Sequence, residues 1–115
     1  MTLDPEAIAR LLEITGDDRA FVDELIDTFL EDAAQQIEAL HAAGSAGDVA
    51  AIVRPAHSLK SNSMNVGATV LADLCRALEA DARDGQVTDM EARIAAVDSE
   101  FAAVRDALLA ERASR

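Results

Sequence analysis

One segment of the chain, from Ala56 to Ala68, holds residues whose types and spacing could do chemistry. His57 is followed one helical turn later by Lys60. A neutral imidazole near pH 7 keeps a nitrogen lone pair that can attack phosphorus. The flexible ammonium of a lysine can neutralise phosphoryl oxygens, and the hydroxyl groups of Ser58 and Ser61 can donate hydrogen bonds to them. A single histidine on a helix is more often only a solvated surface residue, so its surroundings must decide.

The surroundings of His57 lack acidic residues. The 24 residues from 49 to 72 contain no Asp or Glu, although the composition of the chain predicts between four and five. A phosphoryl group beside carboxylates would meet like-charge repulsion, so the gap favours a phosphorylated His57. The competing hypothesis is a helical docking or scaffold module in which His57 is never phosphorylated.

The composition limits the class of protein. A chain of 115 residues forms one domain, residues 1–115, and 22 acids against 10 Lys and Arg argue against a nucleic-acid partner or an anionic membrane. No stretch approaches the roughly 18 apolar residues of a membrane span, and the N-terminus does not resemble a signal peptide. The single cysteine cannot form an internal disulfide, which fits a reducing compartment. We therefore expect a cytoplasmic protein.

The elements that must position His57 are helices. Apolar residues recur at steps of three and four residues, and Gly16, the turn 44–47, Gly67 and Gly85 separate these stretches. The fold class predicted is all-α: an antiparallel up-down-up-down four-helix bundle with a short N-terminal capping helix. Such a bundle leaves no large apolar patch, so we expect a monomer. The helices are expected over residues 5–15, 18–43, 49–65, 68–84 and 89–111.

The third predicted helix has a core side and an outer side. At about 100° per residue, His57 lies about 140° from Ile52 and therefore faces outward, on the same flank as Lys60 and Ser61. Val53 and Met64 are not needed by the core, so we expect them to contact a partner. Pro55 removes one backbone hydrogen bond and predicts a mild kink. The core positions of this helix are Ile52, Ala56, Leu59, Ser63 and Val66, a 4-3-4-3 spacing typical of a bundle seam.

The remaining reactive side chains do not form a site. His41, His57 and Cys75 fall on separate predicted helices without ligand spacing, so no metal and no cofactor are expected on this chain. His41 is predicted to interact with the C-terminus of the second helix, and Cys75 to pack in the core. No pair of catalytic acids is present, so a partner would have to supply Mg²⁺ and an accepting carboxylate.

The central motif resembles the signature of histidine-containing phosphotransfer (HPt) domains. Ala56-His57-Ser58-Leu59-Lys60 and the later Gly67-Ala68 are similar to the family pattern A-H-x-L-K-G-small-small followed by Gly-Ala. The stretch from Leu71 to Glu79 and the segment Phe29-Leu30-Glu31-Asp32 also resemble the family, as does the opening from Leu3 to Phe21. The resemblance covers nearly the whole chain.

The resemblance implies a four-helix bundle that acts as a phosphorelay intermediate rather than as an enzyme, without autokinase activity. His57 would accept the phosphoryl group on Nε2, Lys60 would stabilise it, and Glu79 matches a position where a polar residue often lies near the histidine. Ser61 departs from the family, which commonly has Gly there, and its hydroxyl could touch the phosphoryl group. The implied partners are response-regulator receiver domains and hybrid histidine kinases, docked around His57 on Val53, Met64, Gly67 and Ala68.

Overall fold

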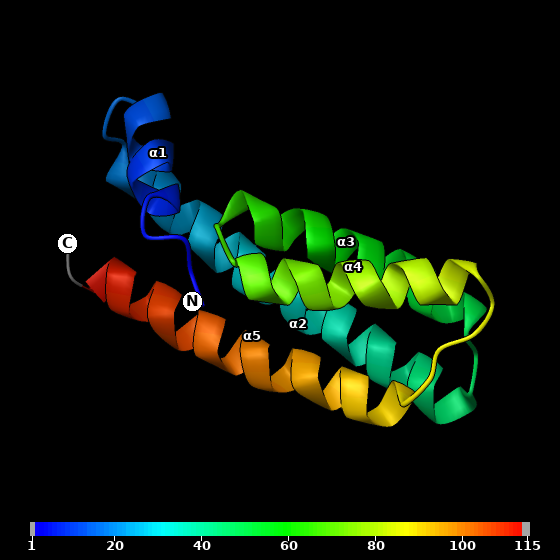
Figure 1. Cartoon of the computed structure of the whole chain (residues 1–115). Helices are drawn as coiled ribbons and strands as arrows, with labels where there is room; N and C mark the ends of the chain where they lie inside the picture. Colours follow the sequence, from blue (N-terminus) through cyan, green and yellow to red (C-terminus); the bar gives the residue numbers. More distant parts are fainter. Residues whose placement is uncertain (1, 114–115) are drawn as a thin grey trace.

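Five α-helices and one short 3-10 turn make up the part of the chain that the computed structural model describes, residues 2–113 (Figure 1). The bounds lie within a few residues of the ranges expected from the sequence. The elements are α1 (Ala7–Ile14), α2 (Arg19–Ala46), η1 (Ala50–Ile52), α3 (Val53–Asn65), α4 (Thr69–Arg83) and α5 (Met90–Ala113).

The four long helices form a closed bundle. α2 packs against α3 and α5, and α4 packs against the same two helices, so each long helix has two neighbours. The molecule measures 44 × 22 × 20 Å, and α1 lies against α2 at one end of the bundle (Figure 1). The all-α bundle with a short N-terminal capping helix is therefore confirmed.

The core follows the apolar spacing of the sequence. Every predicted seam position of α3 is buried, and Phe29 of α2 meets Phe101 of α5 with ring centroids 6.3 Å apart. Burial of each large aliphatic side chain contributes about 1.5–3 kcal/mol, which holds α3 in one orientation. Because the seam is fixed inward, the opposite side of α3 is fixed outward, and His57 lies on that side.

The end of α2 differs from the sequence prediction. The sequence predicts a turn at residues 44–47, but the helix continues through Gly44 to Ala46, and Gly47 is its C-cap with a φ of +65° that suits glycine. α5 packs close to this position, since a Cβ at Gly44 would lie 2.8 Å from Cδ1 of Ile94. Gly44 is thus a packing residue and not a helix breaker.

The start of the His57 helix also differs. The chain makes one 3-10 turn, η1, before α3 begins at Val53, and the side chain of Asp48 accepts a hydrogen bond from the backbone N–H of Ala51 at 3.2 Å. Pro55 is the third residue of α3, within the first turn, where a missing N–H costs no hydrogen bond inside that helix. The irregularity expected at Pro55 therefore precedes it, as the change from 3-10 to α geometry.

Gly67 makes the turn between α3 and α4. Its φ is +76°, and its carbonyl accepts a hydrogen bond from the backbone N–H of Asp4 at 2.7 Å. A Cβ at this position would lie 2.3 Å from the Cβ of Ala7, so only glycine allows the N-terminal segment to lie this close. This contact fastens the start of α1 to the end of the helix that carries His57.

Candidate functional site

His57 projects from the outer side of α3, with 54% of its side chain exposed. Its Nδ1 lies 2.9 Å from Oε2 of Glu79 on α4. Since an ionised carboxylate can only accept, Nδ1 carries the proton in this contact. The neutral ring then keeps its lone pair on Nε2, for which no partner is found among residues 2–113. In this arrangement Nε2 can act as a nucleophile.

Glu79 is the buried centre of the site, with a side chain only 8% exposed. Lys60 donates to Oε1 at 2.6 Å, while His57 Nδ1 shares Oε2 with two donors from Arg83, Nε at 3.1 Å and Nη2 at 2.8 Å. The hydrogen bond from Lys60 is the main reason that the pKa of Glu79 falls to about 2; burial opposes the fall, and Arg83 and His57 add to it. Glu79 is therefore a carboxylate at any physiological pH.

Lys60 and Ser61 continue the outer side of α3 beyond His57. The side chain of Lys60 is 21% exposed and is held against α4 by Glu79. The contact with Glu79 thus fixes the position of the Lys60 ammonium, and Lys60 lies one helical turn after His57. Ser61 is exposed on the adjacent position. Of the residues singled out by the sequence, His57, Lys60 and Glu79 come together in one network.

The four residues expected to contact a partner separate into two pairs. Met64 is 56% exposed and lies against Arg76 of α4, and Val53 is half-buried beside the core. Gly67 and Ala68 are buried, because the N-terminal segment covers the turn. The prediction that these two residues contact a partner is therefore wrong, and Gly67 serves the fold instead.

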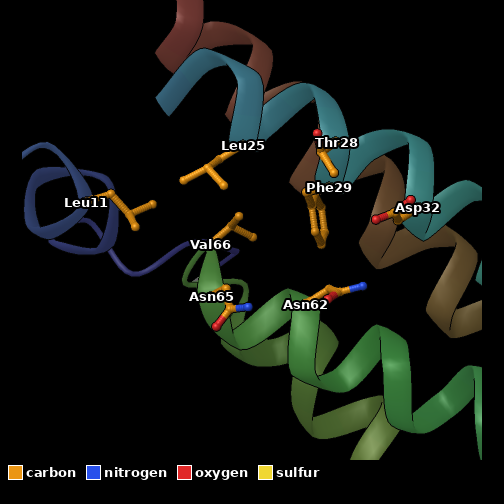
Figure 2. A pocket seen from close by; sticks show the side chains of 8 residues that line it. All are labelled: Leu11, Leu25, Thr28, Phe29, Asp32, Asn62, Asn65 and Val66. Carbon is orange, nitrogen blue, oxygen red and sulfur yellow. The ribbon is translucent and has the colours of Figure 1, made fainter. Parts of the chain in front are cut away.

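A pocket of about 270 Å³ opens where α1, α2 and α3 meet (Figure 2). Leu11 is half-buried at its edge, and Leu25 and Phe29 supply much of its apolar wall. Asn62 and Asn65 form its polar side from α3, so the pocket borders the exposed side of the His57 helix. Its walls are Leu11, Leu25, Thr28, Phe29, Asp32, Asn62, Asn65 and Val66.

The other reactive side chains lie apart from this network. His41 pairs with Asp98 of α5, Nε2 to Oδ2 at 2.7 Å; the prediction that it interacts with the end of α2 is wrong, because the helix continues to Ala46. Cys75 is buried in the core, as predicted, and burial raises its pKa to about 12. Within residues 2–113 no three His, Cys, Asp or Glu side chains are grouped to hold a metal ion. None of the helices described is both long and apolar enough to cross a membrane.

The sequence interpretation missed Arg83 and most of the pocket. A signal for Arg83 existed, since Glu79 and Arg83 are four residues apart on a predicted helix and such pairs meet. The pocket had no comparable signal: Leu25 and Phe29 followed the apolar pattern of the core, and nothing in that pattern indicates which core residues line an opening.

Comparisons with known proteins agree with this geometry. A model of the Hpt domain matches residues 24–107, a range that includes His57, Lys60 and Glu79. The crystal structure of histidine-containing phosphotransfer protein B (HptB) from Pseudomonas aeruginosa PAO1 is similar, with a TM-score of 0.89 and 38% sequence identity over 99% of this chain and 96% of that chain. No curated protein sequence gives a significant match.

Proposed function

Because the chain belongs to the Hpt domain family, we propose that it carries a phosphoryl group on His57 between the proteins of a two-component phosphorelay. The observation that supports this most directly is the contact between Nδ1 of His57 and the buried carboxylate of Glu79. With the proton on Nδ1 in this contact, the lone pair of the neutral ring is on Nε2. A docking module that is never phosphorylated would need no buried acid behind its histidine.

The proposed transfer needs no proton movement. Nε2 attacks the phosphorus of an aspartyl phosphate on a receiver domain, a new N–P bond forms, and the P–O bond to the aspartate breaks with its electron pair left on the carboxylate. The product is a phosphoimidazolium ring whose Nδ1–H still donates to Glu79. The negative charge of Glu79 stabilises that positive ring, and transfer to the next receiver is the same step in reverse.

The neighbouring side chains have supporting roles in this proposal. Lys60, anchored at the site by Glu79, neutralises phosphoryl oxygens. Ser61, in place of the glycine common in the family, offers a hydroxyl donor beside it. Met64 and the half-buried Val53, together with the pocket between α1, α2 and α3, form the surface on which a receiver docks.

The partners follow from the same chemistry. The phosphoryl group arrives from, and leaves to, a receiver-domain aspartate, with a hybrid histidine kinase as an alternative source. The Mg²⁺ ion that such transfers require is bound by the receiver, and this chain is a carrier that is regenerated in each cycle. A cytoplasmic monomer suits that exchange with cytoplasmic receivers.

The test is phosphoryl transfer from a panel of labelled, phosphorylated receiver domains. The wild type should acquire acid-labile label, and His57→Gln should acquire none. His41→Gln is the matched control, since His41 is the other histidine of the chain and its ring also contacts a carboxylate; it should be labelled like the wild type. Binding of several receivers without any labelling would instead establish the docking module.

A further inference from the structure

Arg83 contacts the same carboxylate oxygen that holds the histidine ring. Its Nε and Nη2 lie 3.1 and 2.8 Å from Oε2 of Glu79, and Nδ1 of His57 lies 2.9 Å from that oxygen. Lys60 takes the other oxygen, Oε1. The two cations therefore hold Glu79 from separate sides, and Arg83 is the one that shares an oxygen with the ring.

Lys60 has two roles that compete once the histidine is phosphorylated. In the resting protein it is the counter-charge of Glu79, at 2.6 Å. A phosphoryl group carries more negative charge than a carboxylate and offers three acceptor oxygens, so it draws the ammonium toward itself. Glu79 then loses one of its two cations at the moment when a second anion arrives nearby.

Arg83 does not face this competition. It lies four residues after Glu79 on α4, so its contact depends on a single helix and not on how α3 and α4 meet. Its planar guanidinium makes two hydrogen bonds to one oxygen, which holds the carboxylate in direction as well as in charge. The contact can persist while Lys60 turns to the phosphoryl group.

We propose that Arg83 is a positioning residue that keeps Oε2 of Glu79 directed at Nδ1 while Lys60 serves the phosphoryl group. This inference rests on the proposed function of His57. Its consequence concerns phosphoryl release: the N–P bond breaks, its electron pair stays on Nε2, and a P–O bond forms to the accepting carboxylate. A ring that keeps its Nδ1 proton leaves as neutral imidazole, whereas a ring without that proton must leave as an anion, which is far slower.

The expected effect is therefore a change in pH dependence. Without Arg83, Oε2 of Glu79 is no longer held in line with Nδ1, so the hydrogen bond that keeps the Nδ1 proton on the phosphorylated ring is lost and transfer should decline at a lower pH. The charged groups that the structure places at the ring are Glu79, Lys60 and Arg83. Of these, Glu79 contacts the ring directly and Arg83 and Lys60 contact Glu79.

The experiment measures single-turnover transfer from the phosphorylated protein to a saturating receiver domain between pH 6 and 9. Arg83→Gln should shift the decline of the rate by about one pH unit toward acid, which makes transfer about tenfold slower on the alkaline side. Arg83→Lys should restore only part of the rate, because a lysine at this spacing supplies the charge but not the two hydrogen bonds that direct the carboxylate. Arg105→Gln, an exposed arginine of α5, is the charge-matched control and should behave like the wild type.

A double-variant comparison separates positioning from a general electrostatic effect. If Arg83 acts through Glu79, then Arg83→Gln should have no further effect in a Glu79→Gln background. An Arg83→Gln profile that matches the wild type, or an equal loss in both backgrounds, would overturn the proposal. These outcomes differ from failure of the proposed function, in which the wild type itself would take up no label. Since the side chain of Arg83 is 58% exposed, the variant should fold normally.

Discussion

At the scale of single residues, the chain holds two histidine–carboxylate pairs with opposite character. His41 and Asp98 are both about half exposed, and water competes for their contact. His57 contacts a carboxylate that is 8% exposed and has two further cationic partners. Only the second arrangement fixes the orientation of the ring and the nitrogen that carries its proton. That difference makes His57 a candidate site and His41 a surface residue.

The buried carboxylate gives a prediction about stability and pH. The pKa of Glu79 lies near 2 in the folded protein and near its ordinary value of 4.5 in the unfolded chain. Because the folded value is the lower one, the contribution of Glu79 to the free energy of unfolding is complete above pH 4.5 and is lost as the pH falls toward 2. Chemical denaturation of wild type and Glu79→Gln should therefore show a difference that is largest near pH 7 and shrinks between pH 4.5 and 2.5.

Asp98→Asn is the control for that series, because it removes the carboxylate of the exposed pair. Its difference from the wild type should stay within about 1 kcal/mol at every pH. A Glu79→Gln difference that is constant across the same range would mean that folding does not lower the pKa of Glu79.

Only part of the site around His57 could be predicted from the sequence. His57 and Lys60 could be placed together because helical spacing alone puts them on one side. Glu79 lies 22 residues after His57 on another helix, and its contact depends on how far α4 is shifted along α3. Periodicity indicates which side of a helix faces a neighbour but not that axial shift, so the network around Glu79 required the structure.

At the scale of elements, glycines decide how closely the helices approach. Gly44 was expected to break α2, yet it lies within the helix, since the same residue type that ends helices also admits a packed neighbour. Gly67 does end its helix, and it also accepts the N-terminal segment. Local sequence signals both roles in the same way, and only contacts with distant elements distinguish them.

Gly67→Ala should therefore destabilise the protein by two effects. A positive φ costs a residue with a Cβ about 1–2 kcal/mol, and the overlap with Ala7 adds about 1–3 kcal/mol. Gly85→Ala is the matched control, because Gly85 has a φ of +85° but nothing within 4 Å of the added Cβ. Thermal unfolding should show a small loss for Gly85→Ala and a clearly larger one for Gly67→Ala. Equal losses would show that the N-terminal segment does not hold the turn.

At the scale of the whole molecule, charge is divided between two regions. Residues 49–83 contain four of the ten Lys and Arg residues but three of the 22 acids, so this region carries +1 and the rest of the chain −13. The α3–α4 hairpin that bears His57 is thus the less acidic of these two regions of an acidic protein. A receiver that binds Mg²⁺ must do so with carboxylates, so its own docking face is acidic. Under the proposed function, this division of charge would direct such a partner to the hairpin and away from the rest of the chain.

Arg54 is the side chain best placed for this attraction. It is exposed on α3, one helical turn before His57, and no ion pair is found for it among residues 2–113. Lys60 and Arg83 are held by Glu79, and Arg76 by Asp73, so Arg54 is free to meet a carboxylate of the receiver.

Arg54→Gln should lower the association rate constant with a receiver about threefold at low salt, and the difference should fade above about 0.1 M salt, where screening acts within about 10 Å. Stopped-flow binding at several salt concentrations measures this, with Arg105→Gln as the charge-matched control on α5. If both variants slowed association equally, net charge rather than the hairpin face would be guiding the partner.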